Sequence, residues 1–299
     1  MKRPDRDRAA SCTAVIAGGK LWLVDVGPGS WENVQLWRLP RAALGGVLLT
    51  HFHSDHIGEL GEVSMQSWVA GRESPLAVYG PPGIEAVVNG FNQAYAADSS
   101  YRVAHHGAAF MPPAAVGMVP VTVAADDGAI GAEVLEMDGL RITAFRVDHR
   151  PVDPAYGYRF DYGGRSVVVS GDTKRSESLA RNSRGADVLV HEAVAAHIVK
   201  RLSAKLEERG AARWAKLTSD ILDYHTTPAE AAQVAGEAGA RVLVLTHLVP
   251  PVPNAVARWM FRQGMEVPPG TDVVFGVDGT YVKLEAGTTK IGVTTLEDD

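Results

Sequence analysis

The stretch Thr50-His51-Phe52-His53-Ser54-Asp55-His56-Ile57-Gly58 places three imidazoles and one carboxylate within six residues. It follows the apolar run 47–50, which predicts a buried strand ending where the cluster begins. Because the backbone turns at a strand end, the first two histidines face one point and the Asp-His pair faces a second point nearby. Imidazole and carboxylate are preferred ligands of Zn²⁺, and so dense a cluster has little packing rationale. The stretch therefore predicts a site for two adjacent metal ions.

Three further candidate ligands stand at the ends of other apolar runs, namely His149, Asp172 and His247. One such residue alone is typical of a structural side chain. Their shared position at strand exits, together with the cluster at 51–56, favours a common metal site instead. Gly171 gives the backbone room next to Asp172.

The surrounding pattern predicts many short strands and few helices. Apolar or β-branched runs predict strands over 13–17, 21–26, 47–50, 76–79, 134–137, 141–147, 156–162, 167–170, 186–190, 242–245, 273–277 and 281–284. Gly18-Gly19 and Asp278-Gly279 predict hairpin turns, and helices are predicted from Ile84 and over 194–222. Two sheets packed face to face with helices outside, as one domain over 1–299, fit this order.

Composition excludes several classes of protein. The 299 residues are 46% hydrophobic, which suffices for a sizeable core, and the net charge of −6 disfavours a general nucleic-acid binder. Cys12 is the single cysteine, so no internal disulfide forms. No stretch reaches the length of a membrane span. With no signal peptide at the start, a cytoplasmic location is favoured, and a periplasmic one requires that a signal has been removed.

The chain resembles the metallo-β-lactamase superfamily, whose HxHxDH signature stands here at 51–56. It is similar in particular to the ribonuclease Z and phosphodiesterase/arylsulfatase-like branch. Supporting motifs follow in family order at 23–27, 78–81, 170–173, 188–193, 224–227 and 245–247. The resemblance implies an α+β fold, the four-layer αββα sandwich, and an enzyme, a zinc-dependent metallo-hydrolase. It also implies a homodimer. Relatives open with a strand carrying a Gly-Thr-Gly-type turn, and this sequence begins after it, so we expect either a truncated chain or a missing first strand.

The resemblance also implies a ligand set and catalytic roles. Two Zn²⁺ ions per chain are expected: one held by His51, His53 and His149, the other by Asp55, His56 and His247, with Asp172 and a hydroxide between them. The implied catalytic residues are His225, Asp55 and Asp172, and His225 is expected to protonate the leaving group or stabilise the transition state. Asp25 is either a support behind the ligand loop or a turn residue, and Glu192 is expected to orient His225.

The substrate expected from the sequence is a small anionic ester, either a phosphodiester or a sulfate or related ester. Bacterial ribonuclease Z carries a long tRNA-gripping arm between the positions of His149 and Asp172, where this chain has only about twenty residues, roughly a two-stranded hairpin. The acidic net charge also makes tRNA the less favoured partner. Three alternatives stay open: a tRNA 3′-processing endonuclease, a β-lactamase or lactonase, and a non-catalytic metal-binding module.

Overall fold

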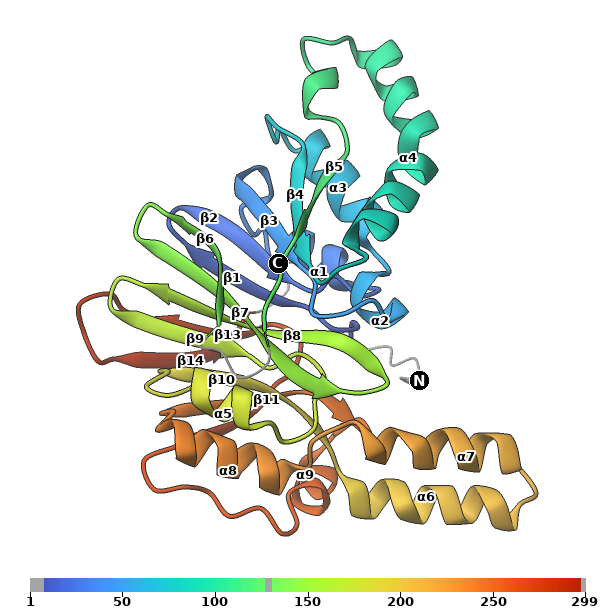
Figure 1. Cartoon of the computed structure of the whole chain (residues 1–299), viewed down its shortest axis with the longest axis vertical. Coiled ribbons are helices and arrows are strands. Elements are labelled where there is room, and N and C mark those ends of the chain that lie inside the picture. The colour runs from blue at the N-terminus through green and yellow to red at the C-terminus, as the bar shows by residue number, and fades with distance from the viewer. Residues whose placement is uncertain (1–7, 127–130, 297–299) are drawn as a thin grey trace.

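The computed structural model describes residues 8–126 and 131–296. Two β-sheets pack against each other, and helices cover their outer faces (Figure 1). The first sheet has five strands in the order β1-β2-β3-β4-β5, and the second has seven in the order β12-β11-β10-β9-β8-β7-β6. A two-stranded sheet pairs β13 with β14. The predicted α+β sandwich of four layers is confirmed.

The five-stranded sheet begins with an antiparallel hairpin and continues with parallel strands. Its strands are β1 (Thr13–Ala17), β2 (Lys20–Val24), β3 (Leu44–Leu48), β4 (Leu76–Gly80) and β5 (Met118–Thr122). The helices of this half are α1 (Ser30–Leu36), α2 (Ser54–Ile57), α3 (Leu60–Val69) and α4 (Ile84–His106), with short 3-10 turns at Arg41–Ala43 and Pro113–Ala115. The predicted hairpin turn at Gly18-Gly19 is present, and both glycines adopt a positive φ.

The seven-stranded sheet is antiparallel from β6 to β9 and parallel from β9 to β12. Its strands are β6 (Ala132–Met137), β7 (Leu140–His149), β8 (Val152–Tyr162), β9 (Arg165–Val169), β10 (Val188–Val194), β11 (Val242–Val249) and β12 (Asp272–Phe275). The helices are α5 (Glu177–Asn182), α6 (Ala196–Glu208), α7 (Ala212–Asp220), α8 (Pro228–Ala238) and α9 (Ala255–Phe261), with a 3-10 turn at Ile221–Asp223. The separate pair is β13 (Thr280–Leu284) and β14 (Ile291–Thr295).

Each interface between layers has its own apolar cluster. Trp22, Leu48 and Ile142 belong to the cluster between the two sheets. A second cluster lies between the five-stranded sheet and its helices, and a third between the seven-stranded sheet and α5 and α8. The buried Tyr158 hydroxyl donates to the Leu49 carbonyl at 2.7 Å and so ties β8 to the end of β3. This packing fixes the two sheets relative to each other at the edge where the candidate ligands lie.

The structure corrects the predicted hairpin at Asp278-Gly279. Strand β12 pairs in parallel with β11, whereas β13 pairs with β14, so the two segments belong to different sheets. Strand β14 was not predicted, because its mostly exposed Ile-Gly-Val-Thr-Thr run carries little apolar signal. Strand β5 was not predicted either, because it contains Pro120 and lies at a sheet edge.

Residues 101–113 form the end of α4 and the connection to the 3-10 turn that follows it. The first six continue α4 to His106, and Tyr101 and Phe110 are 69% and 82% exposed. No helix within the described ranges has the length and apolarity needed to cross a membrane.

Candidate metal centre

The first ligand loop is held from behind by a buried carboxylate. Asp25 follows β2 and accepts hydrogen bonds from the backbone nitrogen and the hydroxyl of Thr50, each at 2.8 Å. It also accepts from His56 Nδ1 at 2.7 Å, which leaves Nε2 of that ring as the atom facing the other candidate ligands. Asp25 has a φ of 60°, a conformation rare outside glycine. The contact to His56 makes it a support for the loop as well as a turn residue.

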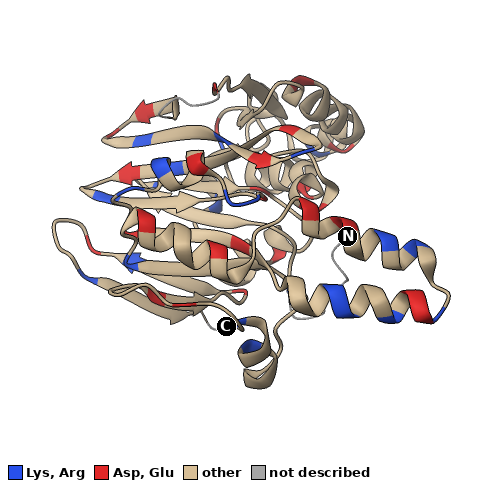
Figure 2. Ribbon diagram, turned by 60° about the horizontal axis from the view of Figure 1, so that its bottom comes forward, with Lys and Arg blue, Asp and Glu red and all other residues tan. Residues whose placement is uncertain are grey.

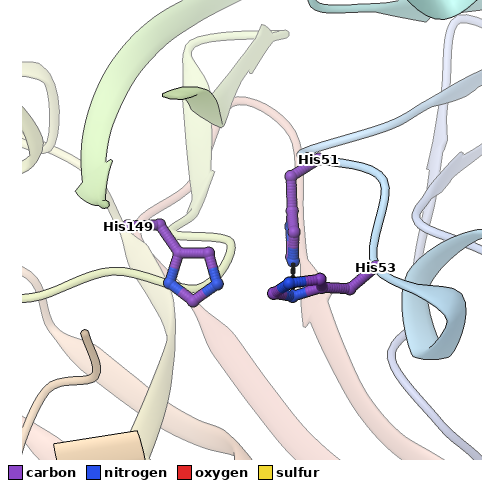
Figure 3. Close-up of side chains that lie close together, drawn as sticks. All are labelled: His51, His53 and His149. Carbon is purple, nitrogen blue, oxygen red and sulfur yellow. Dashed lines mark hydrogen bonds between the residues drawn. The ribbon is translucent and has the colours of Figure 1, made fainter. Parts of the chain in front are cut away.

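A second chain of contacts orients His51. The Thr50 hydroxyl donates to Asp25 and lies 3.0 Å from His51 Nδ1, so its oxygen accepts a hydrogen bond from that nitrogen. His51 Nε2 is then directed at the shared space, where it lies 2.9 Å from His53 Nδ1. His149 faces these two rings from the end of β7 (Figure 3). Its own Nδ1 donates to the Tyr224 carbonyl at 3.0 Å.

The candidate ligands form three overlapping groups whose ligand atoms lie within 4.8 Å of one another: His51-His53-His149, His51-His56-Asp172 and Asp55-His56-His247. The middle group shares His51 with the first and His56 with the third, so Asp172 lies between the outer two. Asp172 Oδ2 is 3.3 Å from His56 Nε2 and 3.6 Å from His247 Nε2. The structure therefore brings all seven predicted residues together from four separate segments.

Several of these groups are buried without a hydrogen-bond partner among the described residues. His149 Nε2 and both ring nitrogens of His247 are in this position. Leaving such atoms unpaired costs free energy unless something else binds them. His247 also has a φ of 44°, so its backbone is strained at the point where its ring enters the site. Both features are typical of residues that bind a ligand.

The charges of the site favour a cation. Burial lowers the pKa of His51, His53 and His149, which keeps these imidazoles in the neutral form that binds metals. Burial also lowers the pKa of His56, but the charges of Asp172 and Asp25 outweigh it and hold that pKa well above its usual value. The carboxylates thus create a negative potential among the candidate ligands.

The two acidic candidates themselves stay ionised. Burial raises the pKa of Asp55, yet His247, whose Nε2 lies 3.6 Å from Asp55 Oδ2, and the charge of His56 bring it well below its usual value. For Asp172, burial is likewise outweighed by the charges of His247 and His56, so the pKa of this carboxyl is also well below its usual value. Both carboxylates are therefore charged at neutral pH.

His225 completes the site from the loop before α8. Its Nδ1 donates to Glu192 Oε1 at 3.0 Å, as expected from the sequence. The same carboxylate oxygen accepts from the backbone nitrogens of Thr226 and Thr173, at 3.0 and 3.2 Å. Burial lowers the pKa of His225, but Glu192 outweighs it and raises the pKa to about 9. The ring centre of His225 lies 5.3 Å from His149 and 5.8 Å from His247.

A capping box fixes the direction of this loop. Thr227 and Glu230 bond reciprocally at the start of α8, and Pro228 occupies its first turn. Arg159 forms a salt bridge with Asp161, and Arg175 forms one with Glu237. The sequence did not reveal the Tyr224 carbonyl, because a backbone acceptor has no residue signature.

A cavity of about 520 Å³ lies apart from most of these residues. It is lined by β1, by β13 and by apolar residues of the seven-stranded sheet, and of the candidate ligands only His247 borders it. The cavity therefore lies beside β1 and β13, and the chemistry is assigned to the clustered ligands.

Comparison with known proteins places the chain in a family. The profile of the β-lactamase superfamily domain matches residues 22–248. The protein named ribonuclease Z of Mycobacterium bovis (strain BCG / Pasteur 1173P2) is 39% identical over 260 residues, 86% of each chain. That of Mycobacterium marinum (strain ATCC BAA-535 / M) is 40% identical over 253 residues, 83% of each chain.

Solved structures agree on the fold. The short form of human tRNase Z and the metallo-β-lactamase fold protein YhfI from Bacillus subtilis each superpose with a TM-score of 0.61 at 20% identity, covering 92% of both chains. The same family is indicated by the matching sequences, by the sandwich fold and by the histidine-rich site. The chain belongs to the metallo-β-lactamase superfamily, in its ribonuclease Z-like branch, and is a metal-dependent hydrolase.

Proposed function

We propose that this protein is an endoribonuclease that cleaves a phosphodiester bond in tRNA precursors with two Zn²⁺ ions. The observation that carries the chemistry is the contact between His225 and Glu192 next to two ligand groups. The substrate is supported by 39–40% identity, over more than four fifths of both chains, to proteins named ribonuclease Z. This reverses the order of substrates expected from the sequence, where tRNA came second to a small ester.

The donor set fits zinc. We assign one ion to His51, His53 and His149, the other to Asp55, His56 and His247, with Asp172 shared between them. Neutral imidazoles, ionised carboxylates and the unpartnered nitrogens of His149 and His247 support this assignment. When bound, zinc would lower the pKa of a water molecule and neutralise negative charge on a phosphoryl group.

The protein's own residues prepare the leaving group. Cleavage of an RNA phosphodiester expels a ribose oxygen, which is a poor leaving group unless it receives a proton. Glu192 holds His225 through Nδ1 and favours its protonated form, so Nε2 is the nitrogen that donates to the departing oxygen. Because the Glu192 carboxylate is also held by two backbone nitrogens, the imidazole keeps one direction.

A small anionic ester is the second candidate substrate. Between His149 and Asp172 the chain contains only β8 and β9, joined by a two-glycine turn at Gly163-Gly164. No segment there extends far enough from the sandwich to hold a distant part of a tRNA. The same catalytic groups could then serve any phosphodiester that reaches them.

Parallel assays on the zinc-loaded protein separate these candidates. We expect site-specific cleavage of a pre-tRNA, slower hydrolysis of bis(p-nitrophenyl) phosphate, and no turnover of nitrocefin or a lactone. Turnover of the small phosphodiester with no cleavage of pre-tRNA would replace the proposal by the second candidate. Efficient turnover of nitrocefin or the lactone would instead assign the site to carbonyl substrates.

A further inference from the structure

The helices α6 and α7 form a hairpin whose two ends connect directly to segments of the candidate site. Strand β10 carries Glu192 and leads into α6, and the 3-10 turn after α7 leads to Tyr224 and His225. Figures 1 and 2 show the hairpin projecting away from the two sheets. With 13 residues, α6 extends about 20 Å from its base. A ligand bound at the site therefore has this hairpin next to it.

The hairpin contributes little to the hydrophobic core. Its helices pack mainly against each other, and only Val199 in α6 and Ala215 in α7 are buried. The Ser203 hydroxyl donates to the Ala215 carbonyl at 2.8 Å and joins the two helices. Folding of the sandwich therefore does not explain the composition of the hairpin surface.

That surface is basic in an acidic protein. From α6 to α7 the hairpin carries six Lys and Arg and three Asp and Glu, whereas the whole chain has a net charge of −6. Figure 2 shows basic residues on both helices of the hairpin. Lys216 pairs with Asp220, but across the described ranges Lys200, Arg201, Lys205, Arg209 and Arg213 form no ion pair. Five exposed cations are thus available to an external polyanion.

An exposed aromatic ring lies on the same hairpin. Trp214 in α7 is 52% exposed, although Trp is a costly residue to leave in water. Indole rings offer a flat surface on which unpaired bases stack, and this contact tolerates any base. A basic surface combined with a stacking ring favours a single-stranded or structured RNA over a small anion, which one or two charges would satisfy.

We propose that the α6–α7 hairpin is an RNA-binding arm that holds the phosphate backbone of the substrate on one side of the bond to be cleaved. The inference rests on the proposed ribonuclease function. The acidic body repels RNA and the hairpin attracts it, so the approaching strand is directed toward the base of the hairpin, where His225 lies. Because the β8–β9 connection of this chain is short, the arm provides another means of holding a large RNA.

Neutralising the arm tests this inference. The arm variant combines Lys200→Gln, Arg201→Gln, Lys205→Gln and Arg209→Gln; the control removes four exposed charges elsewhere, with Lys20→Gln, Arg141→Gln, Lys283→Gln and Lys290→Gln. Binding of a labelled pre-tRNA to the zinc-loaded proteins is followed by fluorescence anisotropy over a salt series. We expect Kd at low salt to rise about tenfold or more in the arm variant, with a shallower salt dependence, and to change much less in the control.

A second pair of variants tests the stacking ring. We expect Trp214→Ala to weaken RNA binding about fivefold or more. The matched control is Tyr101→Ala, which removes an even more exposed aromatic ring from α4, outside the hairpin. Hydrolysis of bis(p-nitrophenyl) phosphate should stay within about twofold of the original rate in all four variants, because none of these side chains lies at the ligand groups.

The outcomes separate the arm from the chemistry. Equal RNA affinity and salt dependence in the arm variant and the original protein would overturn the inference, and so would an original protein that does not bind RNA. A changed molecular mass of the arm variant in solution, with unchanged RNA affinity, would make the hairpin an interface between copies instead. If the original protein binds pre-tRNA tightly but never cleaves it, the proposed function fails, while a tenfold loss in the arm variant still supports the arm.

Discussion

The His56 ring joins two carboxylates: Nδ1 lies 2.7 Å from Asp25 Oδ2, and Nε2 lies 3.3 Å from Asp172 Oδ2. All three side chains are buried. Asp25 belongs to the turn after β2 and Asp172 to the loop after β9, so the contact connects the two sheets through one imidazole. It also fixes which nitrogen of His56 faces the proposed metals.

Removing the support behind His56 should weaken metal binding. In Asp25→Ala the His56 ring loses its acceptor and Thr50 loses two hydrogen bonds. We expect zinc affinity to fall about 10-fold to 100-fold, as for other carboxylates that orient a metal-binding histidine. Competition with a chromophoric chelator measures the affinity. Asp126→Ala, at an exposed position outside the site, is the control, and unchanged zinc affinity in Asp25→Ala would refute this role.

The His225–Glu192 pair should act on the leaving group without holding metal. In His225→Ala we expect near-normal zinc content and a loss of about 10²-fold to 10⁴-fold in kcat for substrates with alkoxide leaving groups. Hydrolysis of bis(p-nitrophenyl) phosphate, whose leaving group is stable without a proton, should fall much less. Glu192→Gln should show the same dependence on the leaving group in weaker form. A parallel loss of zinc in His225→Ala would make that residue a ligand or a structural element.

The salt bridge between Arg165 and Asp187 should make stability depend on pH. Arg165 donates to both carboxylate oxygens, at 3.0 and 2.9 Å, and also to three carbonyls of the segment 285–290, so it ties the β13–β14 pair to the sandwich. Burial raises the pKa of Asp187, but the hydrogen bonds from Arg165 and Ser166 outweigh it and lower the pKa. An Asp whose pKa is lower in the folded state than in the unfolded state, where it is about 3.9, stabilises the fold at a pH above the unfolded pKa. This stabilisation is lost as the pH falls through the pKa of the folded state.

Urea denaturation of Asp187→Asn checks this dependence. We expect about 2 kcal/mol less stability than the original protein at pH 7, and a difference that shrinks when the pH drops below 4. The exposed pair Arg141–Glu136 provides the control, since Glu136→Gln should change stability by less than about 0.5 kcal/mol at either pH. If the difference in free energy of unfolding between Asp187→Asn and the original protein stays constant from pH 7 to pH 3, the stabilising role assigned to the Asp187 carboxylate is contradicted.

The buried contact between the sheets should contribute to stability without affecting the site. Tyr158→Phe removes the hydroxyl that donates to the Leu49 carbonyl and leaves that acceptor unpaired. We expect a loss of about 1 to 2 kcal/mol in the free energy of unfolding, with unchanged zinc content. Thermal and urea denaturation, together with elemental analysis, measure both quantities. A stability equal to that of the original protein would mean that the contact is replaced by solvent.

The sequence predicted the site better than the complete topology, for physical reasons. His51, His149 and His247 were recognisable because each follows an apolar run, and strand ends are where buried elements can present polar side chains. Glu192 was expected to orient His225 only through the resemblance, and the contact depends on β10 and α8 meeting in the fold. The carbonyl of Tyr224 could not be predicted at all, since every residue has one.

Strand pairing was the weaker part of the prediction. The hairpin turn at Asp278-Gly279 looked local, yet β12 pairs with β11, about thirty residues earlier in the chain. Turn residues report a change of direction but not which strand is the partner. Likewise, the charge of the α6–α7 hairpin was averaged out in the net charge of −6, and its projection from the sheets became visible only in three dimensions.

The zinc content of the active protein is the most direct test of the two-metal site. Elemental analysis of the purified protein, during stepwise removal and return of zinc, should give two ions per chain at full pre-tRNA cleavage. Activity should vanish as zinc is removed, and Asp172→Ala should retain less than half the zinc and no activity. Full cleavage by protein that contains no metal would contradict the account.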